Sequence, residues 1–263
     1  MIRFASLSSG SSGNSYLIGY GDKNILIDAG ISNKRIRDGL ESLGIDAESL
    51  SAIFVTHEHS DHIQGLKVFL KKTPVPVYAS FGTLSELANR EFVPHELMHV
   101  VKPYESIKIG ELDVFAHPSF HDTLEPFWYK VTTPEGSVAV VTDIGHVEQE
   151  MGYVLSGLRA ILIEANHDIN MLETGPYTFA LKRRILSDTG HLSNEACGRF
   201  LCDILHDGLE SIALGHLSKE NNYPELALLT VKNEIDFAPI DFVSERLNIF
   251  VAGRDNVTKI LWK

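Results

Sequence analysis

The stretch His57-Glu58-His59-Ser60-Asp61-His62 decides how this chain is interpreted. It places three histidines and one aspartate, all potential metal ligands, in six consecutive residues. Neutral imidazoles and carboxylates are ligands that zinc and similar divalent cations accept. A strand cannot point all four side chains at one centre, because side chains alternate between its faces. We therefore expect a loop here that can divide its ligands between two neighbouring metals.

The flanking residues favour a rigid site over a solvated histidine-rich turn. The apolar run 52–56 precedes the motif and is typical of a strand, while residues 63–70 follow with helical periodicity. Short histidine-rich tracts usually indicate metal binding in any case. The motif is thus expected at the end of a strand and backed by a helix.

Composition limits the class of protein. The chain has 263 residues, 44% of them hydrophobic, which is enough to bury one large core or two small ones. It has no apolar stretch of about 20 residues that would span a membrane, and its first residues are typical of a strand and not of a signal peptide. Cys197 and Cys202 are the only cysteines and suit small core positions, so the sequence favours the reducing cytoplasm.

The formal net charge of −12 argues against broad, non-specific binding to nucleic acid. It leaves room for a local basic groove, and bound divalent metals would offset acidic residues at their site. Basic clusters are more often solvated helix faces. The candidate clusters are Lys34-Arg35-Arg37, Lys71-Lys72 and Lys182-Arg183-Arg184.

The periodicity predicts an α/β fold with two packed sheets covered by helices on their outer faces. No repeat, low-complexity segment or linker divides the chain, so we expect one domain over residues 1–263. The expected strands are 2–7, 15–19, 24–28, 52–56, 75–79, 106–109, 112–117, 127–132, 137–142, 160–164, 211–214 and 248–251. The expected helices are 33–43, 63–71, 81–90, 147–155, 176–187, 194–206 and 224–235.

Further polar residues follow the apolar strands, where loops at the edge of a rigid sheet carry functional side chains. Each of them alone is more often a capping residue or a buried histidine with its hydrogen bonds made. Together they suggest the remaining ligands of a metal site. They are His121, Asp143, His167, His191 and His216.

The order of these residues resembles that of metallo-β-lactamase-fold phosphodiesterases, which combine HxHxDH, a lone histidine, an aspartate at a strand end and a late histidine. The resemblance implies an αββα four-layer sandwich and two divalent metal ions, zinc or manganese. One metal would take His57, His59 and His121, and the other Asp61, His62 and His216. Asp143 would bridge them together with the attacking hydroxide, and Asp28 would brace the motif as a second-shell partner.

His117 is the rival of His121 for the lone-histidine position. It lies inside a predicted strand and precedes a proline, so its direction is less free than that of a loop residue. We therefore assign His121. The remaining histidines match no motif and are expected to be surface or packing residues.

The tracts Glu164-Ala165-Asn166-His167 and Gly190-His191-Leu192-Ser193 resemble paired motifs of tRNase Z-like phosphodiesterases. The resemblance implies that His191 is the general acid and that Glu164 orients it, beside Asp61 among the catalytic residues. Asn166 and His167 would be second-shell partners or a substrate clamp. The second tract also reads as a helix start capped by Ser193 or Asn194, and both can hold, because a helix N-terminus binds phosphate.

The full set of motifs is similar to that of the YycJ/WalJ branch. These motifs are SLSSGSSGNSY, THEHSDHIQG, SFHDTLEP, TDIG, EANHD, GHLSNE and GHLSKENN. The resemblance implies a bacterial, cytoplasmic 5′→3′ exonuclease that acts on DNA ends and is linked to mismatch repair. The β-CASP insertion of larger relatives is absent, so the Gly/Ser turn at 8–12, the basic cluster at 182–184 and the metals would have to grip the nucleic acid.

Other functions remain open on sequence grounds. A small-molecule phosphodiesterase, for example for cyclic nucleotides, or an RNA-processing nuclease would use the same ligands. A non-catalytic metal sensor is disfavoured by the presence of Glu164, His167 and His191. A purely structural zinc protein is disfavoured because structural sites are closed and contain few carboxylates. Phe127 and Trp128 would stack a base at the site mouth or, as we expect, lie in the core.

Overall fold

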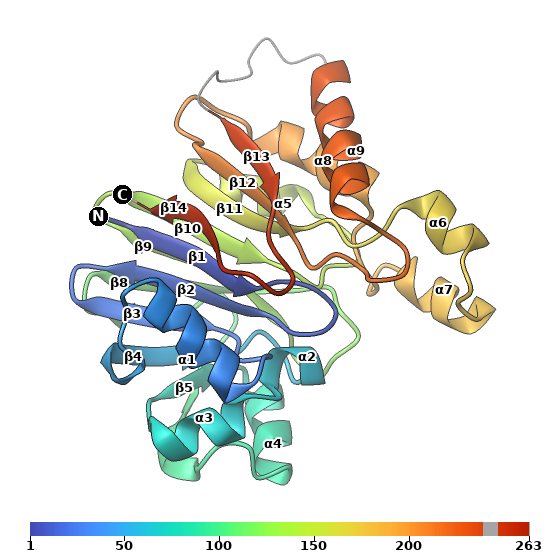
Figure 1. Ribbon diagram of the computed structural model, residues 1–263. Coiled ribbons are helices and arrows are strands. Elements are labelled where there is room, and N and C mark those ends of the chain that lie inside the picture. Colours follow the sequence, from blue (N-terminus) through green and yellow to red (C-terminus); the bar gives the residue numbers. More distant parts are fainter. Residues whose placement is uncertain (239–246, 263) are drawn as a thin grey trace. The chain divides into compact units, whose positions relative to one another are not determined.

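The computed structural model describes residues 1–238 and 247–262, which fall into two compact units (Figure 1). The first unit contains residues 1–119, 123–135 and 253–262. The second contains residues 120–122, 136–238 and 247–252. A single domain over the whole chain stays a prediction.

The first unit is built on a seven-stranded sheet in the order β14-β1-β2-β3-β4-β5-β6. Strands β14, β1, β2 and β3 pair antiparallel, whereas β3 to β6 pair parallel. Their bounds are Thr258–Trp262, Arg3–Ser8, Ser15–Tyr20, Lys23–Ile27, Leu50–Phe54, Val77–Ala79 and Met98–Val100, in the same order. The parallel half brings the carboxyl ends of β3 and β4 to one edge, from which the histidine motif continues.

Helices cover this sheet and supply its core. They are α1 (Asn33–Ser42), α2 (Ser60–Ile63), α3 (Leu66–Lys72) and α4 (Phe81–Asn89). The buried residues of α1 and α3 join those of β3, β4 and β5 in one hydrophobic cluster, so burial of apolar surface fixes the helices on the sheet.

The predicted helix over 63–71 is in fact two helices that meet near Gly65. A Cβ at residue 65 would overlap the carbonyl oxygen of Ile31, and the Gly65 N–H donates to Ala29 O over 2.9 Å. The break lets α2 begin at Ser60, so Asp61 and His62 stand on its first turn.

The first unit also contains an antiparallel meander of β7 (Ser106–Ile109), β8 (Leu112–Pro118) and β9 (Phe127–Thr133). Phe127 and Trp128 on β9 are at most 1% exposed. This confirms the expectation that they belong to the core and do not stack a base.

The second unit is built on four parallel strands in the order β13-β12-β11-β10. The residues of β11 and β12 are fully or almost fully buried apart from Arg159, as expected for parallel strands covered on both faces. The strands are β10 (Gly136–Val141), β11 (Leu158–Glu164), β12 (Ser211–Gly215) and β13 (Asn248–Val251). The helices are α5 (Gln149–Leu155), α6 (Ile169–Thr174), α7 (Phe179–Ile185), α8 (Asn194–Ile204) and α9 (Pro224–Phe237).

All twelve predicted strands are present within a few residues of their predicted ends. Strands β6 and β14 and helix α6 were not predicted, and α7 begins three residues after the predicted start at 176. Cys197 is buried, Cys202 is partly buried, and both are free. Within residues 1–238 and 247–262, no helix combines the length and apolar character needed to cross a membrane.

Candidate metal centre

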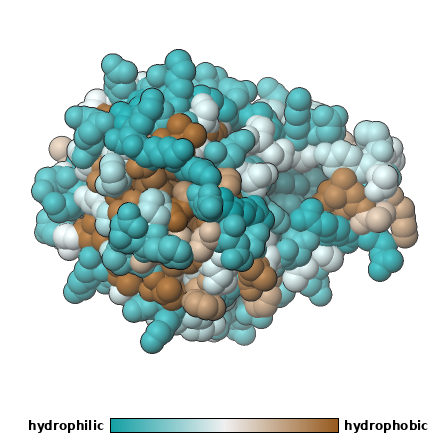
Figure 2. All heavy atoms as spheres, turned by 90° about the horizontal axis from the view of Figure 1, so that it is seen from below, coloured by the Kyte–Doolittle hydropathy of each residue, from teal (hydrophilic) through white to brown (hydrophobic). Residues whose placement is uncertain are grey.

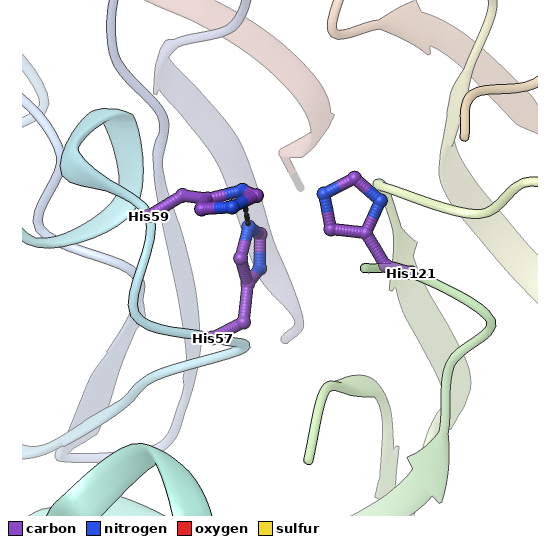
Figure 3. A group of neighbouring side chains, drawn as sticks. All are labelled: His57, His59 and His121. Carbon is purple, nitrogen blue, oxygen red and sulfur yellow. Dashed lines mark hydrogen bonds between the residues drawn. The ribbon is translucent and has the colours of Figure 1, made fainter. Parts of the chain in front are cut away.

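The loop after β4 brings His57 and His59 together (Figure 3), and His62 follows on α2. Nε2 of His57 lies 3.1 Å from Nδ1 of His59, and the rings of His57 and His62 are 4.1 Å apart. His57 and His62 are buried, whereas His59 and Asp61 are partly exposed. Figure 3 also draws His121, the third side chain that the family pattern assigns to the metal of His57 and His59.

Asp28 braces this loop from within the first unit. It follows β3 with a left-handed backbone, φ 62°, and its side chain is fully buried. Its carboxylate lies 2.7 Å from Nδ1 of His62 and accepts the backbone N–H of Thr56 over 2.8 Å and the Thr56 hydroxyl over 2.9 Å. Burial raises the pKa of Asp28, and the bonds from His62 and Thr56 oppose that rise. Because Asp28 occupies Nδ1, a ligand role of His62 would fall to Nε2.

Asn14 is a second support of the motif, and no sequence pattern predicted it. Its N–H donates to the Asp61 carbonyl over 2.8 Å, and its side-chain Nδ2 lies 3.1 Å from Nε2 of His62 and 3.3 Å from Asp61 Oδ2. Its Oδ1 accepts from the Gly10 N–H and the Tyr16 hydroxyl. Asn14 thus ties the Gly/Ser turn to the motif, a tertiary contact that no local pattern announces.

Glu58 lies inside the motif but serves the scaffold. Its carboxylate accepts the Leu124 N–H over 2.9 Å and the Thr83 hydroxyl over 3.2 Å, and the residue is buried. The motif is therefore anchored to α4 and to the loop before β9. The Glu58 carboxylate is thus hydrogen-bonded to scaffold residues and is not directed at the other side chains of the motif.

Three candidate residues of the second unit stand at the carboxyl ends of neighbouring parallel strands. Asp143 follows β10, Glu164 ends β11 and His216 follows β12. With His191, each offers one ligand atom, and these four atoms lie within 4.8 Å of one another. Nδ1 of His216 is 3.3 Å from Asp143 Oδ2. The strand order of this sheet therefore brings together residues that are up to 73 positions apart in the sequence.

His121 lies beside these residues within the second unit, whereas His117 belongs to the first unit. Nδ1 of His121 lies 3.1 Å from the Gly190 carbonyl, which identifies it as the donor, and Nε2 lies 3.7 Å from Asp143 Oδ1. His117 is inside β8, stacks on Trp128 with ring centroids 4.4 Å apart and bonds the Pro118 carbonyl through Nδ1. The metal-ligating role of His121 stays a prediction.

Glu164 and His191 form a buried pair. Oε1 of Glu164 lies 2.7 Å from Nδ1 of His191, while Oε2 accepts the N–H groups of Ile144 and Leu192. Burial by itself lowers the pKa of His191, but the charge and hydrogen bond of Glu164, helped by Asp143, raise it to about 9. In the metal-free chain this pair therefore favours the imidazolium form of His191 at neutral pH.

Asn166 and His167, which were predicted to support the metal ligands or to clamp the substrate, differ in their contacts. Asn166 Nδ2 donates to the His216 carbonyl over 3.0 Å, and its own carbonyl accepts from Asn222 Nδ2 over 3.1 Å. His167 is 1% exposed, and neither ring nitrogen bonds another described residue. Burial lowers the pKa of His167 to about 4, so its ring is neutral. Asn166 therefore supports His216, whereas a clamp role for His167 stays a prediction.

Three candidate residues have left-handed backbones although none is glycine. The φ angles are 62° at Asp28, 57° at Asp143 and 52° at His216. Only Glu91 and Tyr104 share this conformation among the other described non-glycine residues. Asp and His tolerate it better than most residues, and such strain concentrates at functional sites.

The basic residues of two clusters, 34–37 and 182–184, are largely engaged in ion pairs and hydrogen bonds. Lys34 pairs with Asp38, Arg35 with Asp255 and Arg37 with Glu48. Lys182 bonds two backbone carbonyls, and Arg184 pairs with Asp122. These contacts reduce the positive charge that the clusters could offer to the phosphate groups of a nucleic acid.

The donor set fits divalent metal ions. Histidine nitrogens and carboxylate oxygens, mostly buried, lie close together around the motif of the first unit and at the strand ends of the second, which suits zinc and admits manganese. Structural zinc sites rarely contain such carboxylates, so the chemistry of the donors favours a catalytic centre.

Residues 9–155 match the Metallo-beta-lactamase superfamily. The chain belongs to this superfamily. Within it, the chain is 38% identical to Exodeoxyribonuclease WalJ of Streptococcus pneumoniae over 261 residues, 98% of this chain and 97% of that protein. It is 36% identical to Exodeoxyribonuclease YycJ of Bacillus anthracis over 236 residues, 89% of each chain. The predicted WalJ/YycJ relationship is therefore confirmed.

The solved structures agree on the fold. The metallo-β-lactamase fold protein YhfI from Bacillus subtilis matches with a TM-score of 0.71 over 98% of both chains at 15% identity. The predicted α/β class of the metallo-β-lactamase type, with αββα layering, is confirmed. Membership of the superfamily also makes this chain a metal-dependent hydrolase.

Proposed function

We propose that this protein is a metal-dependent phosphodiesterase that degrades DNA from an end in the 5′→3′ direction. The observation that carries the proposal is the cluster of Asp143, Glu164, His191 and His216, in a chain whose full-length relatives are named exodeoxyribonucleases. The cluster combines ligands with a protonated histidine, which is what phosphodiester cleavage needs.

The proposed centre holds two divalent ions, zinc or manganese. His57, His59 and His121 would hold one ion, Asp61, His62 and His216 the other, and Asp143 both. When bound, the ions would polarise the phosphodiester and lower the pKa of water. Asp28 would keep the ring of His62 in the ligating orientation because it bonds Nδ1, whereas Asn166 would fix the backbone of His216 through its carbonyl.

The chain supplies the proton for the leaving oxygen. Glu164 holds Nδ1 of His191, so Nε2 is the nitrogen that faces the reacting group. The raised pKa keeps the proton on the ring until negative charge develops on the leaving oxygen. Transfer then leaves a neutral imidazole whose Nδ1–H still donates to Glu164.

The test is degradation of linear duplex DNA labelled at the 5′ or the 3′ end, with zinc or manganese supplied. The matched control is Asp143→Asn, because asparagine tolerates the left-handed backbone and keeps the side-chain shape. Stepwise release of the 5′ label by the wild type, lost in the variant, supports the proposal. Release from the 3′ end contradicts the polarity.

The same preparation is tested on bis-p-nitrophenyl phosphate, RNA and cyclic nucleotides. Hydrolysis of the generic phosphodiester without degradation of DNA would contradict a DNA exonuclease. It would assign the centre to RNA processing or to a small phosphodiester, according to which of the two is cleaved.

The family relationship also favours a cytoplasmic role in mismatch repair. Deletion of the gene should then raise the spontaneous mutation frequency of the host. The wild-type gene should restore the frequency and Asp143→Asn should not. An unchanged frequency would contradict the repair role and leave the enzymatic proposal standing.

A further inference from the structure

One face of α7 carries an exposed aromatic side chain beside a cation. Phe179, Arg183 and Leu186 are spaced i, i+4 and i+7, which places them on one side of the helix. Phe179 is 76% exposed and Leu186 47% exposed, and Arg183 is exposed as well. Figure 2 shows hydrophobic residues bordered by hydrophilic ones on the lobe of α6 and α7, at the right of the view.

The three basic residues of α7 have different contacts. Lys182 bonds the carbonyls of Glu173 and Gly175, both over 2.8 Å, and so closes the end of α6. Arg184 pairs with Asp122 through two hydrogen bonds. Arg183 instead holds its guanidinium 5.9 Å from the centre of the Phe179 ring. A cation and an aromatic ring thus form one exposed pair on this face.

The helix is attached firmly to the candidate site of its own unit. The Ile185 carbonyl accepts the His191 N–H over 2.9 Å. Arg184 donates to the carboxylate of Asp122, which follows His121 in the sequence. Phe179 precedes Arg184 by five residues, about 7.5 Å along the helix axis.

We propose that Phe179 and Arg183 bind an unpaired base of the DNA strand close to the bond that is cleaved. Phe179 stacks on the base and Arg183 contacts the adjoining phosphate. Every base has a π-face, so such stacking accepts any sequence, and a chain of net charge −12 needs a local cation to hold a polyanion. The inference rests on the proposed function, since it names where that substrate is held.

The test compares Phe179→Ala, Phe179→Trp and Arg183→Ala with Tyr153→Ala. Tyr153 is a matched control, because it lies on α5 of the same unit and is 74% exposed. Steady-state kinetics use duplex DNA with a single-stranded 5′ overhang and, separately, bis-p-nitrophenyl phosphate. The loss of one stacked base should raise KM for DNA between about 5-fold and 150-fold in Phe179→Ala, with Phe179→Trp restoring it.

Tryptophan at position 179 gives a second readout. Its fluorescence should fall on addition of single-stranded DNA and should change little with blunt duplex, because only an unpaired base can stack on the ring. Hydrolysis of bis-p-nitrophenyl phosphate should be unchanged in all four variants.

Three outcomes would overturn the proposal. The first is an unchanged KM for DNA in Phe179→Ala, and the second is an equal loss of activity on DNA and on bis-p-nitrophenyl phosphate. The third is a wild type that elutes as a dimer on size-exclusion chromatography and a Phe179→Ala variant that elutes as a monomer with unchanged KM. That result would assign the face to a second copy of the chain. Failure of the proposed function is distinct from these outcomes, because it appears as the absence of DNA degradation by the wild type.

Discussion

Oε1 of Glu164 lies 2.7 Å from Nδ1 of His191, and the same carboxylate accepts two backbone N–H groups through Oε2. The carboxylate is fully buried at the end of β11. Its position is therefore set by the sheet and by the loops that follow β10 and precede α8. The hydrogen bond to Glu164 fixes the position of the His191 ring, and the charge of Glu164 raises the pKa of that ring.

Glu164→Gln should lower kcat for phosphodiester cleavage by about 100- to 10,000-fold, the usual contribution of a positioned general acid. The amide oxygen of the glutamine still accepts the N–H groups of Ile144 and Leu192, so the amide NH₂ faces His191. The variant therefore lacks the negative charge that keeps the proton on His191. Single-turnover kinetics on DNA and bis-p-nitrophenyl phosphate measure the loss. Unchanged kcat with normal metal content would remove the pair from the mechanism.

The same pair predicts a pH dependence of stability for the protein stripped of metal by a chelator. The pKa of His191 is raised from 6.5 to about 9 in the folded chain. Its stabilisation is therefore complete below about pH 6.5, where both folded and unfolded states hold the proton, and it is lost as the pH rises through about 9. The loss is at most about 3 kcal/mol.

Urea unfolding from pH 6 to 9.5 measures this term, with Glu164→Gln as the reference. The wild type should lose stability relative to the variant across that range. Parallel curves for the two proteins would mean that Glu164 does not hold the proton on His191.

Asp28→Asn should weaken metal binding by about 10- to 100-fold while the protein stays folded. Asparagine tolerates φ 62° and its oxygen still accepts from Thr56. Its NH₂ then faces Nδ1 of His62, which forces the proton onto the nitrogen needed for the metal. Competition with a chromophoric chelator measures the affinity. Asp22→Asn, an exposed carboxylate paired with Lys23, should leave it unchanged.

Gly30→Ala should displace the backbone of the HxHxDH motif at Asp61. A Cβ at residue 30 would overlap the Asp61 carbonyl oxygen, so the loop or α2 must shift, at a cost of about 1–3 kcal/mol or more. Urea midpoints and metal content should both fall. At Gly152, in α5, a Cβ has no atom within 4 Å, so Gly152→Ala should be neutral or slightly stabilising. Equal behaviour of the two variants would refute the argument.

Much of the candidate site could be predicted because its residues follow apolar strands. A strand ends at or just before the motif, Asp143, Glu164 and His216. The order of these residues matches the family pattern, which assigns a role to each. Asn14, Glu58 and Asn222 could not be found in this way. Their signals are tertiary, since each bonds a residue at least 25 positions distant.

The fold shows the same division. Apolar runs predicted the buried strands, whereas Met98–Val100 is short and largely exposed and carries little apolar signal. Thr258–Trp262 pairs with β1 across almost the entire sequence. The break at Gly65 was also hidden, because its cause is the approach of Ile31.

The left-handed backbones at Asp28, Asp143 and His216 limit how this centre can be re-engineered. Cysteine or glutamate placed there to favour another metal would carry about 1–3 kcal/mol of backbone strain, whereas asparagine, aspartate, histidine and glycine are the natural repertoire of that conformation. His57 and His59 do not have this conformation. A search for variants with altered metal preference should therefore start from His57 and His59 and leave the three strand-end positions unchanged.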